Sequence, residues 1–474
     1  MQLRNLLLSS SITTRHLAIY PRSVSSTPRR IRFIAMAAQL DNDIPLPPRM
    51  EAVHLDQPFL STTLAELSRL QSKRVFVMAN KSSRDIVQPL LDALEAQSLV
   101  AAPLFTGISM GGGETGLLAA CDAAAAADAD AVVSVGGGAV QDAAKIVRMW
   151  LSYCRLDNLA SGANEASRPS SPSPASLVGL QVASKLNPLP PWPPQVALPN
   201  SFAKAELTAV AGLTTAAKTK SGFSNPSLMP TVVIFDPTLT RGLPDWVRFG
   251  TALRCVEHAV GAVTHPNATP ALSAQALRGL AEVKAGLNAM VTEPESHAAA
   301  VQVYRGGALA VRALNTNQCY PALGHLVANL YSAAFDVHQG ACSGILCARL
   351  LAHHATGSAA QQQQIAQVLC DSNLSLSDSS TCSSTEKSEG NLGQVDGSKE
   401  KELQPSSTAG LVAALAAHLP GVECEHFSGG AVNLESLALF ATNAPLNRFN
   451  SLSPVPFASS DEFLQVITRP LDTL

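Results

Sequence analysis

Short apolar runs alternate with helical stripes in the first half of the chain. RVFVMAN (74–80) has the length of a buried strand, and the segment after it, up to Gln97, has helical periodicity. The apolar stripe of this helix contains Ile86, Leu90, Leu91 and Leu94. VAAPLFTGI (100–108) and AVVSV (131–135) predict two more strands, separated by an alanine-rich helix over about 113–128. This spacing indicates parallel βαβ units, which bind ligands at the carboxyl ends of their strands.

Two low-complexity segments interrupt this pattern. Residues 155–195 are rich in proline and serine and predict a surface insertion, because such a segment cannot extend a helix or a central strand. TVVIFDP (231–237) is the last segment with strand character, and the periodicity after it is helical. A second insertion is expected over 373–408, where polar residues replace apolar ones. We therefore expect an α/β domain over 50–244 and a helical domain over 245–474.

The first 40 residues have a different composition. They contain six arginines, many hydroxyl side chains and no acidic residue before Asp41. Cationic, hydroxylated and acid-poor segments are typical of organelle transit peptides. Residues 1–40 are therefore expected to address the protein to a mitochondrial matrix or a chloroplast stroma, and the composition does not separate the two. A disordered basic tail is the alternative interpretation.

The composition of the 474 residues excludes several classes of protein. With 46% apolar and 15% charged residues, the chain is typical of a globular protein and not of a wholly disordered one. A net charge of −3 gives no basic surface for nucleic acid, and no apolar run of about 18 residues predicts a membrane span. Nine cysteines without a CxxC pair indicate free thiols in a reducing compartment.

Three glycines follow the third predicted strand directly, in AVVSVGGGAVQDAAK (131–145). Glycines at the end of a buried strand let the backbone turn tightly and approach a phosphate, and the following helix offers unpaired N–H groups to it. The spacing is not GxGxxG, so the usual dinucleotide fingerprint does not apply. Taken alone, the segment also fits a plain strand–turn–helix connection.

Several motifs in order resemble one enzyme family. GGGAVQDAAK is similar to the GGGSxxDxAK signature of the iron-containing alcohol dehydrogenases and maleylacetate reductases. RVFVMANKSSRD and FTGIS resemble that family's first two strands, and LPNSFAKAELTAVAGLT (198–214) resembles its second cofactor loop. KSGFSNPSLMPTVVIFDPTLTRGLP (220–244) is similar to its KxGxxDPxLxPxxxxxDPxLTxxLP stretch. The resemblance covers about 75–340 and implies a dinucleotide-binding α/β domain followed by an all-helical domain, the dehydroquinate synthase-like architecture.

The resemblance implies a nicotinamide cofactor and residues that hold it. Gly137 and Gly138 are expected to lie against the pyrophosphate, and Asp142 to face the nicotinamide side of the cleft. Asn200 and Ser201 are expected to line the second loop beside the nicotinamide.

Further positions bear on the ribose groups of the cofactor. Lys220 is expected to reach the ribose hydroxyls, and Lys145 occupies the family's lysine position, where a role on the helix surface is equally open. Asn80 stands where NAD-preferring members often have Asp. A neutral residue there, with Lys81 and Arg84 nearby, favours NADP(H) slightly over NAD(H) because it removes repulsion of a 2′-phosphate. These two cations also fit solvated charges at a helix start.

The expected metal site departs from the family pattern on one helix. Typical members hold a divalent ion with an Asp, a His four residues later and two further His. In TALRCVEHAVGA (251–262), His258 occupies the first His position but Arg254 stands where Asp is expected. A guanidinium cannot ligate a cation. The neighbouring Glu257 is expected to point about 100° away around the helix and not to replace the Asp. Some relatives carry Arg at this position in a GxRALDH pattern.

The second metal motif departs further, in CYPALGHLVANLYSAAFDVHQGACSG (319–344). Pro321 occupies the first His position, and His325 the second, which in the family lies near the reacting carbon. The last ligand is either lost to Gln339 or, in a register shifted by one, supplied by His338. Only His258 and His338 remain as metal-ligand candidates, so any Fe or Zn is expected to bind weakly.

The leading functional hypothesis is an NAD(P)-dependent oxidoreductase that interconverts a small carbonyl compound and its alcohol by hydride transfer, with a mechanism that need not use a metal. Arg254 is a candidate to polarise the carbonyl or hold a carboxylate, and His258 and His325 are candidate proton donors. Two structural histidines lining a cleft are the alternative. A nucleotide-binding relic without turnover is the alternative function. The expected partners are a small substrate and, by resemblance, a second copy of the chain, with neither nucleic acid nor membrane.

Overall fold

The computed structural model describes residues 49–474 except 162–171, 184–191, 317, 372–406 and 421–433. The described residues form one compact unit. The predicted transit peptide, residues 1–40, and nearly all of the predicted insertion at 373–408 lie outside the described residues. No helix in the described ranges is long and apolar enough to cross a membrane.

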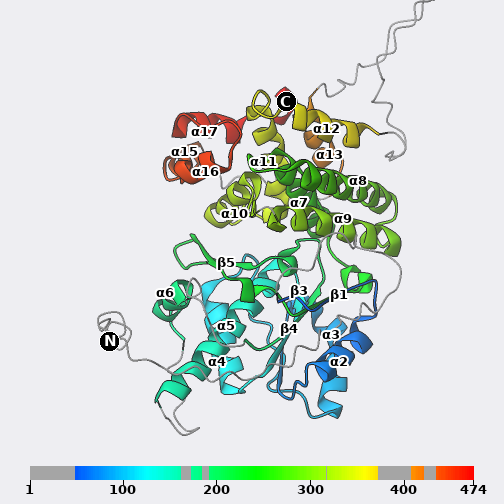
Figure 1. Cartoon of the computed structure of the whole chain (residues 1–474), viewed down its shortest axis with the longest axis vertical. Coiled ribbons are helices and arrows are strands. Elements are labelled where there is room, and N and C mark those ends of the chain that lie inside the picture. Colours follow the sequence, from blue (N-terminus) through cyan, green and yellow to red (C-terminus); the bar gives the residue numbers. More distant parts are fainter. Residues whose placement is uncertain (1–48, 162–171, 184–191, 317, 372–406, 421–433) are drawn as a thin grey trace, which may run out of the picture. The chain divides into compact units, whose positions relative to one another are not determined.

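The first half of the described chain contains a five-stranded, fully parallel sheet (Figure 1). Its order is β1–β7–β4–β3–β2. The strands are β1 (Ala52–Leu55), β2 (Val75–Ala79), β3 (Ala131–Gly136), β4 (Gln195–Pro199) and β7 (Val232–Phe235). Strands β2, β3, β4 and β7 are buried throughout, as expected for a parallel sheet that is covered on both faces.

Helices cover both faces of this sheet because successive strand side chains alternate between them. Phe76 and Met78 of β2 pack with residues of α4 (Glu114–Ala126) and α5 (Gly138–Ser161). Their neighbours Val75, Val77 and Ala79 pack instead with residues of α2 and α3 on the other face. The helices on this second face are α2 (Phe59–Arg69) and α3 (Arg84–Ala96).

Two local predictions in this region are wrong. Residues 100–108 form no strand and make only isolated bridges, at Val100 and Phe105, because Pro103 between them has no N–H with which to continue the ladder. In α3 the side chain of Ile86 is 37% exposed. The buried stripe is Val87, Leu90, Leu91 and Leu94, the i, i+3, i+4, i+7 set of a helix that begins at Arg84.

The structure also contains elements that the sequence pattern did not predict. A two-stranded antiparallel hairpin, β5 (Val210–Thr214) and β6 (Lys220–Ser224), follows the second loop. Within the range of the predicted insertion 155–195, α5 continues to Ser161 and α6 spans Pro174–Ala183.

The second half is helical throughout its described residues, which confirms the predicted fold class (Figure 1). Helix α7 (Asp245–Thr264) is its central helix and is buried on all sides over most of its length, since α8, α9, α10 and α11 pack around it. Those four helices are α8 (Pro270–Thr292), α9 (His297–Thr316), α10 (Leu323–Phe335) and α11 (Gln339–His353). The remaining helices are α12 (Ala359–Cys370), α13 (Thr408–Ala417), α15 (Leu434–Thr442), α16 (Leu446–Leu452) and α17 (Ser460–Thr468).

Candidate active site

The glycine turn lies between β3 and α5. Strand β3 ends at Gly136 and α5 begins at Gly138. A Cβ on Gly136 would lie 2.3 Å from Oδ1 of Asn80, so this position accepts only glycine while Asn80 keeps its place. Gln141 holds the turn from behind, since its Nε2 donates to the carbonyls of Ser134 and Gly136 at 3.1 and 3.0 Å. Sequence reasoning did not identify Gln141.

The second loop meets this turn from β4. A Cβ on Gly137 would lie 3.2 Å from Oγ of Ser201 and 4.0 Å from Oδ1 of Asn200. Nδ2 of Asn200 donates to Oγ of Ser83, in the segment that follows β2, at 3.0 Å. The carboxyl ends of β2, β3 and β4 are neighbours in the sheet, and their loops therefore meet. The structure thus brings together the five predicted cofactor residues of these loops, which are Asn80, Gly137, Gly138, Asn200 and Ser201.

The predicted residues Asp142 and Lys145 form a buried anchor. Nζ of Lys145 donates to Oδ1 of Asp142 at 3.0 Å and to the carbonyls of Ala205 and Val210, both at 2.7 Å. Oδ2 of Asp142 accepts from the backbone N–H of Gly212 at 2.9 Å. The side chain of Lys145 is fully buried, so a role on the helix surface is wrong. The pair ties α5 to the hairpin β5–β6.

Lys220 lies at the start of β6, on the same hairpin. Its Nζ donates to the carbonyl of Gly111 at 3.1 Å. Burial lowers the pKa of Lys220, and the charge of Asp142 acts against this shift. Lys220 therefore lies near the predicted cofactor residue Asp142, but its amino group is directed to a neighbouring loop.

Arg254 approaches the glycine turn from α7. Its Nη1 lies 3.8 Å from where a Cβ on Gly138 would be, and only 8% of the residue is exposed. Its Nε has no hydrogen-bond partner among the described residues. The first turn of α5 adds the positive end of a helix dipole. A buried cation beside a helix N-terminus favours an anion or a developing negative charge at this point.

A second buried cation, Lys204, was not identified from the sequence. Lys204 is fully buried in a left-handed conformation (φ 63°), and its Nζ has no hydrogen-bond partner in the described ranges. Nζ lies 3.6 Å from the ring centroid of Tyr304, a cation–π contact. Burial lowers the pKa of Lys204, and Arg254 adds to this shift.

His258 and His325 contact each other across α7 and α10. Nε2 of His258 lies 3.2 Å from Nδ1 of His325, and the hydroxyl of Tyr320 lies 3.1 Å from Nε2 of His325. Both histidines are buried, at 0% and 4% exposed. Burial lowers the pKa of each imidazole, for His258 well below its usual value of 6.5. Both rings are therefore neutral near pH 7, and Tyr320 is a site residue that sequence reasoning missed.

Glu257 lies within reach of both histidines, which its angle around the helix did not predict. Its Oε2 lies 3.4 Å from Nδ1 of His325 and 3.7 Å from Nε2 of His258. Glu257 and His258 leave α7 in different directions. The glutamate side chain is nevertheless long enough to reach His325 of α10, which also contacts His258. The three residues form a buried group with the donor atoms of a metal site. The only sequence signal was an acid next to the histidine.

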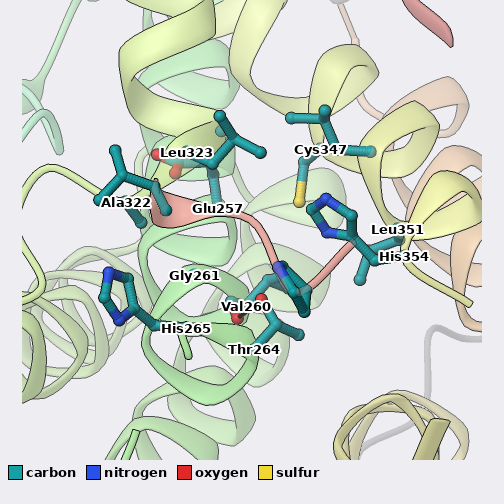
Figure 2. A pocket seen from close by; sticks show the side chains of 14 residues that line it. Glu257, Val260, Gly261, Thr264, His265, Ala322, Leu323, Cys347, Leu351 and His354 are labelled. Carbon is teal, nitrogen blue, oxygen red and sulfur yellow. Dashed lines mark hydrogen bonds between the residues drawn. The ribbon is translucent and has the colours of Figure 1, made fainter. Parts of the chain in front are cut away.

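The other carboxylate oxygen of Glu257 faces a pocket among the helices. Oε1 lies 3.1 Å from the position that a Cβ on Gly324 would take and 3.7 Å from the position that a Cβ on Gly261 would take. Figure 2 shows this pocket, whose lining also includes His265 and His354. Glu257 therefore lies between the pocket and the two histidines.

His338 lies apart from this group. Its ring packs edge-on against Trp246 with 4.9 Å between the ring centroids. Its Nδ1 is 3.2 Å from where a Cβ on Gly250 would be. Burial lowers the pKa of His338 to about 4, with a contribution from Arg254. With Arg254 and Pro321 at two ligand positions and His338 held by Trp246, the family's own ligand set does not fit this chain.

Comparisons with known proteins agree with this geometry. The iron-containing alcohol dehydrogenase family matches residues 53–237, and its C-terminal domain matches residues 250–393. A maleylacetate reductase of Pseudomonas knackmussii is 23% identical over 294 residues, which cover 61% of this chain and 69% of that protein.

Solved structures share the fold. A maleylacetate reductase from Agrobacterium tumefaciens superposes with a TM-score of 0.62 at 18% identity, over 92% of this chain and 98% of that one. An NADH-dependent butanol dehydrogenase from Thermotoga maritima gives 0.67 at 15% identity, over 90% and 98%. Since the two family matches together span most of the chain and include the glycine turn, Arg254 and the two histidines, this protein belongs to the iron-containing alcohol dehydrogenase family.

Proposed function

We propose that this protein is an NAD(P)-dependent oxidoreductase that interconverts a small carbonyl compound and its alcohol by hydride transfer. The observation that carries the proposal is the meeting of three loops, after β2, β3 and β4, directly beside Arg254 of the helical region. A parallel sheet binds nucleotides at this edge, and the helical region supplies a buried cation and two histidines next to it.

In this proposal Gly137 and Gly138, at the start of α5, would hold the diphosphate of the cofactor. The helix dipole and the unpaired backbone N–H groups would stabilise its negative charge. Asn200 and Ser201 line the nicotinamide side, and the amide of Asn200 is already oriented by Ser83. Asp142 borders the nicotinamide side of the cleft and also anchors the hairpin, and Lys220 borders the ribose side.

We infer that both cofactors bind and that NADP(H) binds somewhat more tightly. Asn80 follows β2 and is neutral, and Lys81 and Arg84 begin the next helical segment. A carboxylate in place of Asn80 would repel a 2′-phosphate, whereas an amide does not.

The reducing direction needs a hydride, a proton and stabilisation of the carbonyl oxygen. A nicotinamide cofactor held by Gly137, Gly138, Asn200 and Ser201 would supply the hydride, and the carbonyl oxygen would then gain negative charge. Arg254 stabilises that charge through its guanidinium N–H groups. The proton comes from the hydrogen-bonded pair Tyr320 and His325, with His258 in contact with Nδ1 of His325. An oxo acid suits this site best, because a buried cation also binds a carboxylate.

A nucleotide-binding relic without turnover is the second candidate. It is favoured by the replacement of two family metal ligands by Arg254 and Pro321. For either candidate we propose a homodimer in a mitochondrial matrix or chloroplast stroma, with free thiols. Among the described cysteines, Cys121, Cys255, Cys342 and Cys347 are free thiols.

Two measurements on the purified protein separate these candidates. Fluorescence titration with NADH and NADPH measures cofactor binding, and a panel of aldehydes, ketones and oxo acids measures turnover. Binding together with turnover supports the enzyme, with the fastest rates expected for oxo acids. Binding without turnover across the whole panel supports the relic, and absence of nucleotide binding contradicts both.

A further inference from the structure

Three ligand atoms converge between α7 and α10. Nε2 of His258 lies 3.2 Å from Nδ1 of His325. Oε2 of Glu257 lies 3.7 Å from Nε2 of His258 and 3.4 Å from Nδ1 of His325. Tetrahedral zinc, with bonds of about 2.0–2.1 Å, holds its ligand atoms roughly 3.3 Å apart. The three separations lie around that distance, so one ion of this size fits between the three atoms.

The carboxylate of this cluster lacks the partners that a buried charge requires. Glu257 is 1% exposed, and neither of its oxygens has a hydrogen-bond partner in the part of the chain that the structure describes. A buried carboxylate without partners is costly, and it is normally paired with a cation or bound to a metal. No lysine or arginine side chain within the described ranges forms an ion pair with Glu257, whose only charged-group contacts are the two histidines.

We propose that Glu257, His258 and His325 bind one divalent transition-metal ion, Zn²⁺ or Fe²⁺. Two imidazoles and one carboxylate are the ligands of many catalytic zinc and non-haem iron sites, which keep at least one position open. In this ligand set Glu257 takes the part of the aspartate that the family pattern places at the position of Arg254. His325, near the reacting carbon in the family pattern, becomes a ligand.

The surroundings of the cluster support an ion at this point. The hydroxyl of Tyr320 contacts Nε2 of His325 and leaves Nδ1 directed at the cluster, which is how ligating imidazoles are usually oriented. Oε1 of Glu257 borders the pocket of Figure 2, so one carboxylate oxygen faces the pocket and the other faces the two histidines.

This proposal goes beyond the proposed function, because nucleotide binding at the glycine turn does not require the ion. With the ion bound, His325 is held as a ligand and Tyr320 remains its second contact. Without the ion, His325 and Tyr320 act as described above.

The test is metal binding by the full-length protein after treatment with a chelator. Calorimetric titration with Zn²⁺ measures affinity and stoichiometry, and Co²⁺ reports the ligand geometry through its visible absorption. The wild type is expected to bind one ion per chain. Glu257→Gln, which keeps the size of the side chain, is expected to weaken binding about 100-fold or more and to weaken the Co²⁺ bands. Should Glu257→Gln not fold by circular dichroism, Glu257→Asp serves, with the same direction expected.

Two control variants make the result specific. Glu282→Gln removes a carboxylate of α8 that pairs with Arg305, and it should leave the affinity unchanged. His338→Ala removes the ligand that the family register would use, and it too should leave the affinity unchanged. The proposal is overturned if the wild type binds no ion, if Glu257→Gln binds as tightly as the wild type, or if His338→Ala loses as much affinity as Glu257→Gln. NADPH titration of the same samples tests the proposed function separately.

Discussion

The amide oxygen of Asn80 occupies the space where a side chain on residue 136 would begin. A Cβ on Gly136 would lie 2.3 Å from it, and 2.9 Å from Cβ of Val140. This contact joins the ends of β2 and β3, two neighbouring strands whose loops would hold the cofactor. Gly136 is therefore needed because the side chains of Asn80 and Val140 come close to its backbone, in addition to the need for glycine where a phosphate approaches.

Gly136→Ala is expected to lower nucleotide affinity about tenfold or more, because Asn80 must leave its place at the turn. Gly222→Ala is the matched control. A Cβ on Gly222 of β6 would have no described atom within 4 Å, and little change is expected. Fluorescence titration with NADPH measures both variants. Equal affinities for the two variants would contradict the arrangement of Asn80 and the turn.

Asn80→Asp is expected to change the cofactor preference. The new carboxylate keeps the shape of the side chain and repels a 2′-phosphate, so NADPH affinity should fall about tenfold, or roughly 1.4 kcal/mol. NADH carries no 2′-phosphate, and its affinity should change much less. Parallel titrations with the two cofactors provide the comparison. A parallel loss for both would mean that Asn80 does not face the adenosine ribose.

Arg254→Ala is expected to cut carbonyl reduction on the order of 10²-fold or more, the usual effect of losing one charge-stabilising donor. Nucleotide affinity should stay near the wild-type value, since the glycine turn is intact. Steady-state rates and NADPH titration test the two statements separately. If turnover survives the substitution, the family assignment stands and the role of Arg254 in catalysis is wrong. If nucleotide affinity falls instead, Arg254 holds the diphosphate.

Lys145→Met is expected to lower the free energy of unfolding by about 3–5 kcal/mol. It leaves Asp142 without its buried cation and frees two carbonyls from their donor. Lys73→Met, at an exposed position, should change the free energy of unfolding by no more than about 0.5 kcal/mol. Urea denaturation followed by circular dichroism measures the difference. Similar stabilities for the two variants would show that Lys145 is not an anchor.

His354 is expected to make stability depend on pH. Burial, with a contribution from His353, lowers its pKa to about 3, against 6.5 in an unfolded chain. Between these values the unfolded state takes up a proton that the folded state does not, so stability is lost as pH falls from 6.5 towards 3. The thermal midpoint of the wild type should drop over this window. The thermal midpoint of His354→Gln should drop less over the same window. If the midpoint of the variant falls with pH as steeply as that of the wild type, His354 is not a source of the pH dependence.

The sequence by itself determined the α/β and helical halves, the glycine turn and the second loop. Each depends on local patterns, such as buried strands, glycines at a strand end, and a helical period after Pro244. The parallel βαβ units also placed the ligand site at the carboxyl ends of the strands, whereas the order of the strands was not predicted. Asn80, Gly137 and Asn200 were identified from the resemblance to the family.

Only the tertiary structure decided how the helical half completes the site. Glu257 and His325 are far apart in sequence, and whether their side chains meet depends on how α7 and α10 pack and on the reach of a long side chain. The burial of Lys145 likewise depends on the hairpin that folds over α5, and the separation of His338 depends on its packing against Trp246. A periodic pattern specifies which face of a helix is apolar, but not which polar side chains of two helices come within ligand distance of each other.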